Sequence, residues 1–415
     1  MMKPIFLQKI NNLFHFLWAL GSAFFYRFPS QKMVVIGVTG TTGKSTTVEM
    51  IAAVLEKVGY KTASISSIRF KVAGESSENL MKQTMPGRGY LQKFLRKALD
   101  SGCQYAVIEV SSEGIKQHRQ RFINFDVGVI TNLAPEHIES HGGFENYKKT
   151  KIKFFTQITS SREKIIGGKE IKKILAINSE MSETVQFAVG DVPIIDFDSK
   201  KADDVNLKLV GEFWNLNANA ALAAAQSQGV DRGLAVGVLN SIESIPGRME
   251  EVKEGQDFRV FIDYAHTPDA LESVYKTLSS KPQAPSSKLI CVLGAAGGGR
   301  DKWKRPEFGK LAWQYCDEII LSNEDPYDEN PEEILNQISS GFSQIRNSKF
   351  EIRNFHKILD RREAIVKAID LTRGSDIVII TGKGCESWMM VAGGKKIPWD
   401  DRKIVREALL NKKSA

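Results

Sequence analysis

The chain has 415 residues, 42% hydrophobic and 26% charged, so it is long enough for two or three domains with sizeable cores. Its 57 lysines and arginines exceed its 49 aspartates and glutamates, and this net charge of +8 suits polyanionic substrates such as nucleotides. No basic cluster with interleaved aromatic residues is present, so a nucleic-acid partner is not expected.

The first element is the strongly apolar, aromatic segment Leu13–Phe28. It is too short and too interrupted for a membrane span, and no small-residue cleavage site follows it, so a signal peptide is not expected. Two interpretations stay open. The favoured one is a helix packed on the first domain, and the other is an interfacial helix that makes a peripheral membrane contact.

A phosphate-binding loop comes next, between a strand predicted at 33–38 and a helix predicted at 44–58. Residues 39–47 read Thr-Gly-Thr-Thr-Gly-Lys-Ser-Thr-Thr. Gly40 and Gly43 allow the backbone N–H groups to face an anion. Lys44 supplies a charge to the terminal phosphates, and Ser45 offers a hydroxyl group to Mg²⁺. An ordinary turn is the alternative, but strand, loop and helix follow in the order that phosphate binding needs.

The rest of the first domain alternates strands with helices, which predicts a mainly parallel, covered sheet. Further strands are expected at 62–66, 105–110 and 126–131, and helices at 88–101, 145–158 and 214–229. The helix 145–158 places Tyr147, Lys151 and Phe155 on one face. Residues 159–210 are expected to form short strands and loops.

A break near Ile245-Pro246-Gly247 separates a second α/β series. Its strands are expected at 258–263, 288–294, 317–322 and 376–381, and its helices at 268–279, 305–315, 331–344 and 361–372. The predicted fold class is therefore α/β, with a central P-loop domain and a Rossmann-like C-terminal domain. The predicted boundaries are 1–31 for the apolar segment, 32–245 for the first domain and 246–415 for the second.

The four cysteines (Cys103, Cys291, Cys316 and Cys385) show no C-x-x-C spacing. The first three lie in or beside apolar runs, so we expect them to be reduced residues that pack in the core. This pattern fits the reducing cytosol, and a cytoplasmic location is expected.

Two polar positions follow strands beside the phosphate loop. Glu109 ends the strand 105–110, where such folds hold Mg²⁺. His137 follows the strand 126–131 and is a candidate second ligand. A buried, satisfied glutamate and a structural histidine are the alternatives.

Several further motifs occur in one order along the chain: E-V-S-S, N-L-x-x-E-H, Y-x-x-T-K, P-G-R-M-E, D-Y-A-H-T-P-D-A-L, G-x-x-G-G-x-R-D, D-R-R-E-A-I and G-K-G-x-E. Together with the phosphate loop, this set resembles the Mur ligase family over about residues 33–410. It is most similar to the MurE type, the UDP-N-acetylmuramoyl-tripeptide synthetases. The resemblance implies an ATP-dependent ligase that phosphorylates a muramoyl-peptide carboxylate and joins a free amino acid to the acyl-phosphate.

The resemblance also implies roles for individual residues. Lys44, Lys151 and His266 would be catalytic, and Lys151 would be carbamylated to help place the second of two Mg²⁺ ions. The implied metal ligands are Ser45, Glu109, His137 and Lys151. The implied ATP-binding residues are Gly40, Thr41, Thr42, Gly43, Lys44, Ser45, Thr46, Asn217, Arg248 and Asp263. The implied substrate contacts are Thr84, Ser111, Ser112, Arg305, Asp325, Gly382 and Glu386.

The chain departs from the family pattern in several places. The family normally has a domain of about a hundred residues before the phosphate loop that grips the UDP-sugar, whereas only the apolar segment precedes the loop here. Tyr327 stands where enzymes selecting meso-diaminopimelate carry an arginine, which favours lysine or another amino acid. Trp214 replaces an asparagine, while Glu113 and Cys385 each replace a histidine.

These departures leave three hypotheses open. The first is a ligase of peptidoglycan-precursor synthesis, and the second is a related ligase for a lipid-linked muropeptide or a poly-amino-acid such as cyanophycin. The third is a nucleotide-binding scaffold without ligation, which the retained Lys44, Glu109 and Lys151 disfavour. The sequence leaves the oligomeric state open, with a monomer expected.

Overall fold

The computed structural model describes residues 5–81, 83–87, 89–200, 202–280, 287–343 and 354–414. The chain forms two compact units. Unit 1 comprises Met1–Pro135, His141–Lys208 and Phe213–Ile242, and unit 2 comprises Glu136–Ser140, Leu209–Glu212 and Glu243–Ala415. Each unit is an α/β fold built on a mainly parallel sheet, so the predicted fold class is confirmed. The domain boundaries drawn from the sequence stay predictions.

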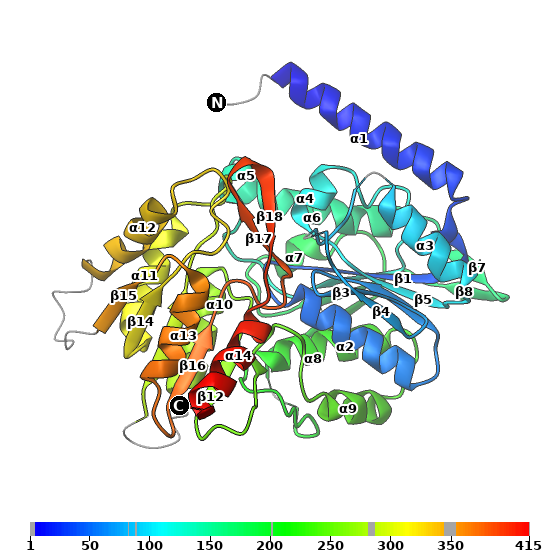
Figure 1. The fold of residues 1–415 in the computed structure, drawn as a ribbon. Helices are drawn as coiled ribbons and strands as arrows, with labels where there is room; N and C mark the ends of the chain where they lie inside the picture. Colours follow the sequence, from blue (N-terminus) through cyan, green and yellow to red (C-terminus); the bar gives the residue numbers. More distant parts are fainter. Residues whose placement is uncertain are drawn as a thin grey trace. The chain divides into compact units, whose positions relative to one another are not determined.

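Unit 1 contains an eight-stranded sheet in the order β10-β9-β6-β1-β5-β2-β3-β4, in which β3 runs antiparallel to its neighbours β2 and β4 and all other pairs are parallel. Helices α2, α8 and α9 pack together on one face, and α3, α4 and α6 lie on the other (Figure 1). The strands are β1 Val34–Thr39, β2 Thr62–Ile65, β3 Arg69–Val72, β4 Glu75–Glu78, β5 Tyr105–Glu109, β6 Val127–Ile130, β9 Ile174–Asn178 and β10 Ile194–Phe197, with the separate pair β7 Lys164–Ile166 and β8 Lys169–Ile171. The helices are α1 Ile5–Phe25, α2 Lys44–Lys57, α3 Tyr90–Asp100, α4 Ser112–Lys116, α6 Phe144–Thr159, α7 Thr184–Phe187, α8 Trp214–Gln226 and α9 Arg232–Ser241, with a short 3-10 helix at Pro29–Lys32. The short helix α5 Ile138–His141 lies mostly in the segment Glu136–Ser140, which belongs to unit 2.

The register of this sheet explains where a site can form. Val38 of β1 is paired with Glu109 of β5, and Thr39 is paired with Ile130 of β6. Because these strands are parallel, the loops that follow them leave the same edge of the sheet. The glycine-rich turn after β1 therefore lies between the ends of its two neighbouring strands. The hydrophobic core below that edge is continuous and buried.

Unit 2 contains a six-stranded sheet in the order β11-β12-β16-β13-β14-β15, parallel except for β11. Helices α10, α11 and α12 pack together, while α13 and α14 contribute to one core with the sheet. The strands are β11 Glu250–Glu251, β12 Arg259–Ile262, β13 Leu289–Leu293, β14 Glu318–Leu321, β15 Asn354–Lys357 and β16 Ile377–Ile380, with the hairpin β17 Trp388–Val391 and β18 Lys395–Pro398. The helices are α10 Pro268–Ser279, α11 Lys304–Tyr315, α12 Pro331–Ser343, α13 Arg361–Leu371 and α14 Asp401–Ser414, with a 3-10 turn at Ala392–Gly394.

The predicted strands and helices of both series are present within one to three residues of their expected ends. The helix ends predicted at residues 88 and 344 fall outside the described residues. Two strands of the irregular stretch 159–210, β9 and β10, extend the main sheet of unit 1. Tyr147, Lys151 and Phe155 do share a buried face of α6, as their spacing predicts.

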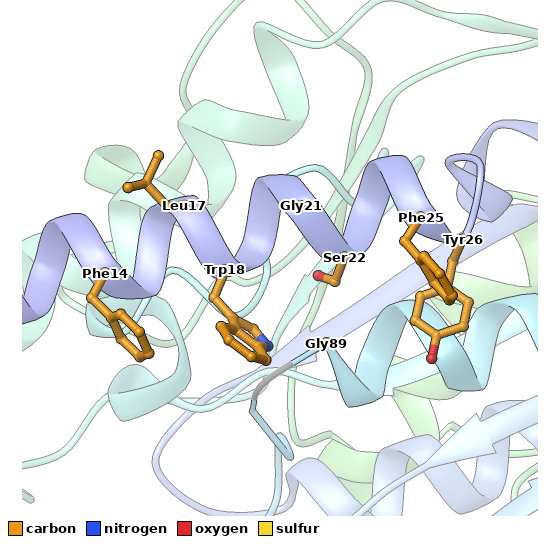
Figure 2. A pocket seen from close by; sticks show the side chains of 8 residues that line it. All are labelled: Phe14, Leu17, Trp18, Gly21, Ser22, Phe25, Tyr26 and Gly89. Atoms are coloured by element: carbon orange, nitrogen blue, oxygen red, sulfur yellow. The ribbon is translucent and has the colours of Figure 1, made fainter.

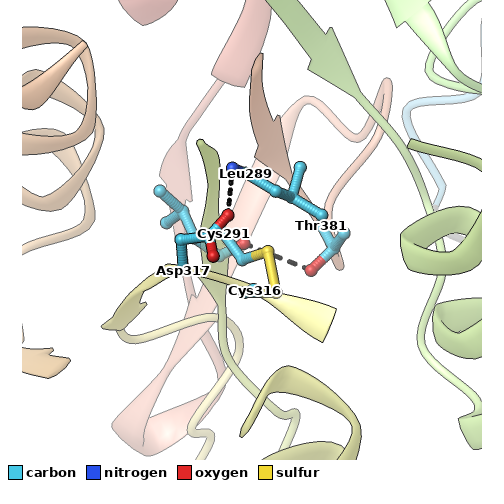
Figure 3. The surroundings of a disulfide bond; sticks show 6 residues. Leu289, Cys291, Cys316, Asp317 and Thr381 are labelled. Atoms are coloured by element: carbon cyan, nitrogen blue, oxygen red, sulfur yellow. Dashed lines mark hydrogen bonds between the residues drawn. A yellow bond between two sulfur atoms is a disulfide. The ribbon is translucent and has the colours of Figure 1, made fainter. Parts of the chain in front are cut away.

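The expectation that Cys291 and Cys316 are reduced is wrong. The two form a disulfide between β13 and the residue that follows α11, with 6.1 Å between their Cα atoms (Figure 3). The chain returns beside β13 because β14 pairs with it, and the Leu289 N–H donates to Asp317 Oδ2 at 2.8 Å beside the bridge. A crossover of 25 residues separates the two cysteines, and only the fold brings them together. Cys103 is free and buried, as expected.

The disulfide predicts the outcome of a thiol titration. Unfolded protein, treated without reductant, should expose two thiols, those of Cys103 and Cys385, and four after reduction. Cys103→Ser should lower both counts by one. Four reactive thiols in unfolded, unreduced protein would contradict the bridge.

Among the described helices, none is long and apolar enough to cross a membrane.

Candidate functional site

The turn between β1 and α2 has the backbone of a phosphate cradle. Gly40 has φ 148°, and Gly43 caps α2 with φ 77°. A Cβ on Gly40 would lie 2.0 Å from Thr131 Oγ1, and one on Gly43 would lie 2.1 Å from Asn217 Oδ1. Only glycine fits at these two places, so the turn stays tightly curled with the N-terminus of α2 facing the sheet edge.

Side chains from neighbouring elements hold this turn. Asn132 Oδ1 accepts hydrogen bonds from the backbone N–H groups of Thr41 at 3.0 Å and Thr42 at 2.9 Å. The Thr41 hydroxyl lies 3.0 Å from the Tyr147 hydroxyl. The Lys44 ammonium group donates to the carbonyl oxygen of Thr41 at 2.8 Å, so its charge sits over the turn itself. Thr46 follows in the buried first turn of α2.

Glu109 lies at the same sheet edge and is 1% exposed. Its Oε2 atom accepts a hydrogen bond from the Ser45 hydroxyl at 2.8 Å and one from the Ser67 N–H at 2.7 Å. The Ser67 hydroxyl lies 2.8 Å from that of Thr84. The predicted magnesium ligands Ser45 and Glu109 are therefore neighbours, and a predicted acceptor contact, Thr84, is one residue further away.

Lys151 is fully buried in α6 beneath the turn. Its ammonium nitrogen donates to the carbonyl oxygen of Gly40 at 2.7 Å and lies 4.7 Å from the centre of the Tyr147 ring. Burial holds the pKa of Lys151 well below its usual range, and the nearby charge of Lys44 lowers it further, while Glu109 opposes the shift. This environment favours an uncharged amine, which is a nucleophile.

Ser111 and Ser112 follow β5 at the start of α4. The Ser111 hydroxyl accepts a hydrogen bond from the Gly114 N–H at 3.2 Å, and the Ser112 hydroxyl lies 3.2 Å from His141 Nε2. Glu113 Oε1 lies 3.5 Å from the same histidine nitrogen. The unusual glutamate at position 113 thus has partners within unit 1, the His141 ring and the Lys116 ammonium group at 3.9 Å.

Asn217 lies in the first turn of α8 and is buried against the phosphate turn. Its side-chain oxygen accepts from the Thr47 hydroxyl at 3.5 Å, besides facing Gly43. Trp214, at the start of the same helix, is buried. The indole therefore belongs to the packing of α8.

In unit 2, Asp263 follows β12 and is buried. Its two carboxylate oxygens accept hydrogen bonds from the N–H groups of Met249 at 2.7 Å and Ala265 at 2.6 Å. Burial raises the pKa of Asp263, and the charge of Arg248 opposes the rise. The Arg248 guanidinium lies 4.3 Å from the centre of the Tyr264 ring. The predicted ATP contacts Arg248 and Asp263 are therefore neighbours.

His266 is oriented by a short backbone contact, because its Nδ1 atom lies 2.8 Å from the carbonyl oxygen of Tyr264. Lys304 donates to the carbonyl oxygen of His266 at 3.1 Å and to Glu136 Oε1 at 3.1 Å. His137 belongs to the same short segment of unit 2 as Glu136, and it has a left-handed backbone with φ 55°. Lys304 thus connects the segment that carries His137 to the loop that carries His266.

The carboxylates predicted to contact the incoming amino acid surround a buried lysine. Lys383 donates to Asp325 Oδ1 at 3.0 Å, to Glu386 Oε2 at 2.7 Å and to the carbonyl oxygen of Trp388 at 2.5 Å. The hydroxyl of Tyr264 donates to Glu386 Oε1 at 3.1 Å. A substrate ammonium group at Glu386 would therefore share this carboxylate with Lys383.

Arg305 is fully buried, and its guanidinium donates to Glu329 Oε2 at 3.0 Å, to Gln337 Oε1 at 2.7 Å and to the carbonyl oxygen of Ala296 at 3.1 Å. These bonds fix the loop after β13 to α12. Gly382 has φ 103°, and a Cβ there would lie 2.3 Å from Glu324 Oε2. Arg305 and Gly382 therefore shape the loops of unit 2, and their substrate contacts stay predictions.

Glu324 provides a test by pH. The pKa of Glu324 is raised from 4.5 to about 7, first by burial and then by the charge of Asp325, while Arg361 and Lys383 oppose the rise. The folded protein therefore binds more protons than the unfolded chain between these two values, so stability should fall as pH rises through this window. The shift corresponds to roughly 3 kcal/mol at full effect.

Glu324→Gln should remove that loss. The variant should melt higher than the parent near about pH 8 and close to it near about pH 5, measured by thermal unfolding. Glu332→Gln, at an exposed position of α12, is the matched control and should follow the parent. A constant difference at all pH values would contradict the assignment.

The predicted site residues divide between the units. Those of unit 1 gather at one sheet edge: Gly40, Thr41, Thr42, Gly43, Lys44, Ser45, Thr46, Thr84, Glu109, Ser111, Ser112, Lys151 and Asn217. Those of unit 2 are His137, Arg248, Asp263, His266, Arg305, Asp325, Gly382 and Glu386. Within the described residues, no three His, Cys, Asp or Glu side chains gather in a way that could hold a metal by themselves.

Sequence reasoning missed four residues that organise these clusters. Asn132 and Tyr147 hold the phosphate turn, Ser67 holds Glu109, and Lys383 joins two carboxylates. Asn132, Tyr147 and Lys383 lie inside motifs that carry the family resemblance, so their motif membership was the available signal. Ser67 carried none, because it follows β2 and only the sheet order brings it near.

Two family models match this chain: the Mur ligase middle domain at residues 38–225, and the Mur ligase, glutamate ligase domain at residues 247–384. A UDP-N-acetylmuramoyl-L-alanyl-D-glutamate--2,6-diaminopimelate ligase of Syntrophomonas wolfei is 34% identical, over 95% of this chain and 82% of that protein.

Among solved structures, a ligase of the same name is 28% identical with a TM-score of 0.57, over 92% of this chain and 79% of the other. The folylpolyglutamate synthase of Mycobacterium tuberculosis, solved with ADP and AMPPCP, shares the fold at 17% identity with a TM-score of 0.69, over 88% of this chain and 92% of the other.

Proposed function

Since this chain belongs to the Mur ligase family, we propose that it adds an amino acid to the peptide carboxylate of a muramoyl-peptide cell-wall precursor through an acyl-phosphate. A carboxylate oxygen of the acceptor attacks the γ-phosphorus of ATP, and ADP leaves. The amine of the incoming amino acid then attacks the acyl carbon, phosphate leaves, and the amine loses a proton as the amide forms.

The observation that carries this proposal is the cluster at the edge of the unit 1 sheet. The glycine turn, the Ser45–Glu109 pair and the buried Lys151 lie together there. A simple nucleotide-binding scaffold needs no buried lysine beneath the phosphate turn. A reaction that forms an acyl-phosphate beside the phosphates of ATP does need groups that place cations around these two anions.

Ser45 and Glu109 fit a magnesium site, because a hydroxyl and a carboxylate are hard oxygen ligands beside a phosphate cradle. Bound there, Mg²⁺ would neutralise charge on the phosphates. We propose that Lys151 helps to hold a second ion. The uncharged amine of Lys151 would add to the carbon of CO2 and release a proton, which leaves a carbamate anion in place of an ammonium group. The chemistry of Lys151's buried site supports this modification.

The proposal has a second form, which differs in the acceptor and in the amino acid that is added. A lipid-linked muropeptide or a poly-amino-acid acceptor would use the same activation. Tyr327 lacks the fork of donors with which an arginine grips a carboxylate, so lysine or another amino acid is proposed ahead of diaminopimelate. A peripheral membrane contact through Leu13–Phe28 is also proposed, and it would bring the ligase to an acceptor carried on lipid.

The test is phosphate release from ATP and Mg²⁺, with UDP-N-acetylmuramoyl-dipeptide and a panel of single amino acids, and the product measured by mass. A mass gain of one amino-acid residue is expected with one member of the panel, and it identifies that amino acid. If the protein binds ATP but releases phosphate with no amino acid of the panel, the acceptor is not UDP-linked. The same panel with a lipid-linked muropeptide in place of the UDP-linked dipeptide then tests the alternative acceptor.

A further inference from the structure

Helix α1 presents an apolar stripe to solvent. Phe24 and Phe25 are 76% and 73% exposed, far beyond what a packed phenylalanine shows. The other exposed members follow at helical spacing on the same side: Leu13, Phe14, Leu17, Trp18 and Leu20. So large an apolar patch, with two aromatic rings in contact at Phe14 and Trp18, marks an interaction surface.

The opposite side of α1 is packed on unit 1, so the stripe has a defined direction. The Phe16 ring lies 5.3 Å from that of Phe122 and 6.0 Å from that of His118. Near the other end, Ser22 lies so close to Gly89 that a Cβ on this glycine would be 2.7 Å from Ser22 Cβ. Because α1 rests on these contacts, it holds the stripe outward.

Two open grooves follow the stripe. One, of about 440 Å³, runs between α1 and the start of α3 and is lined by Phe14, Leu17, Trp18, Gly21, Ser22, Phe25, Tyr26 and Gly89 (Figure 2). The other, of about 670 Å³, is lined by Gly21, Phe24, Phe25, Phe28 and one cation, Arg27. Apolar and aromatic walls that end at a guanidinium match the boundary between acyl chains and phosphate headgroups.

The charged residues of the first 48 positions have a single sign. Residues 1–48 contain no aspartate or glutamate, and Arg27 and Lys32 are exposed directly after the helix. Beside the packed side of α1, burial lowers the pKa of His118, and the charges of Arg121 and Lys153 lower it further. Cations at one end of an apolar stripe complement a surface that is apolar inside and negative outside.

We propose that the exposed stripe of α1 docks on an anionic phospholipid bilayer, with the side chains of Leu13–Phe25 in the interface and Arg27 and Lys32 at the headgroups. The inference deepens the membrane contact proposed above by naming its partner. It does not depend on ligase activity, because docking needs neither ATP nor acceptor. Through it, the sheet edge of unit 1 would work close to a membrane surface.

The experiment is flotation of the full chain with vesicles of phosphatidylcholine alone, or of phosphatidylcholine mixed with phosphatidylglycerol. The chain should float with the anionic vesicles at low salt, and less so at high salt, since screening weakens attraction between exposed charges. Replacing both Arg27 and Lys32 by glutamine should weaken binding about 25-fold, because each cation near an anionic surface contributes a factor of about five. The double variant Phe24→Gln, Phe25→Gln should abolish flotation.

Matched controls separate this stripe from general stickiness. Ile165 and Val185 are equally exposed apolar residues elsewhere in unit 1, and Ile165→Gln, Val185→Gln should float like the parent. Lys395→Gln, Lys396→Gln, at exposed positions of β18, should also leave flotation unchanged. Equal binding to neutral and anionic vesicles would overturn the proposal. The absence of flotation would also overturn it. If the chain then forms dimers that the Phe24→Gln, Phe25→Gln variant breaks, a second copy of the chain covers the stripe.

Discussion

Lys44→Ala is expected to abolish ATP-dependent ligation while the protein stays folded. The Lys44 ammonium group already sits over the phosphate turn, bound to the carbonyl oxygen of Thr41, so it is placed to meet the terminal phosphates of ATP. Charge on those phosphates grows as the γ-phosphoryl group is transferred, and a fixed cation stabilises the transition state more than the ground state. We expect phosphate release to fall by at least about 10³-fold.

The matched control for this variant lies on the same helix. Lys57 is exposed in the last turn of α2, so Lys57→Ala should keep the parent's rate of phosphate release. Thermal unfolding should be nearly the same for both variants, because Lys44 packs against the turn and not in the core. If Lys44→Ala releases phosphate at the rate of Lys57→Ala, the turn is not the site of phosphoryl transfer.

The phosphate turn was predictable because all its determinants are local in sequence. One short stretch of sequence contains a strand, two glycines, Lys44 and the start of a helix. Each of these can be interpreted from the residues next to it. The position of Glu109 was predictable for a related reason. Parallel strands of one sheet share a carboxyl edge, so a residue that ends β5 lies at the same edge as the turn that ends β1. The pairing of β5 with β1 then places Glu109 beside that turn.

The partners of these residues were harder to predict, because strand order decides them. Ser67 reaches Glu109 only since β2 lies next to β5, an order that alternating strands and helices do not specify. The same holds for the Cys291–Cys316 bridge, where pairing of β13 with β14 brings two distant thiols together. Apolar surroundings correctly predicted burial of both cysteines but gave no sign of their contact.

The role of the two carboxylates predicted to contact the substrate was hard to predict for a different reason. Asp325 and Glu386 were assigned to the substrate from the family resemblance, yet in the fold both accept from the fully buried Lys383. A charge pattern alone does not reveal whether an ammonium group comes from the substrate or from the chain. Tyr327, which contributes no charge near neutral pH, packs its ring against Gly298. The charge of Arg300 acts on both Tyr327 and Glu386, so the chain supplies a second cation here besides Lys383.

Lys151→Ala is expected to lose ligation, and a short external carboxylate is expected to restore part of it. The lysine points from α6 to the carbonyl oxygen of Gly40, and burial favours the uncharged amine that can add to CO2. The resulting carbamate is an anion at a fixed place beneath the phosphate turn. Alanine leaves a space there, which formate or acetate can enter with a carboxylate of similar charge. A loss of about 10² to 10³-fold is expected, with partial recovery that rises with carboxylate concentration.

Recovery distinguishes a chemical role from a structural one. If Lys151 only supported the fold, a small anion would not replace its long side chain, and activity would stay low at every concentration. Lys153→Ala, at an exposed position of the same helix, should keep full activity and gain nothing from formate. Mass measurement of the intact parent under CO2 gives an independent readout, because a carbamate adds the mass of CO2 and Lys151→Ala removes that addition. Full activity of Lys151→Ala without any added carboxylate would show that no carbamate is needed, and the second cation would then have to be held by other residues.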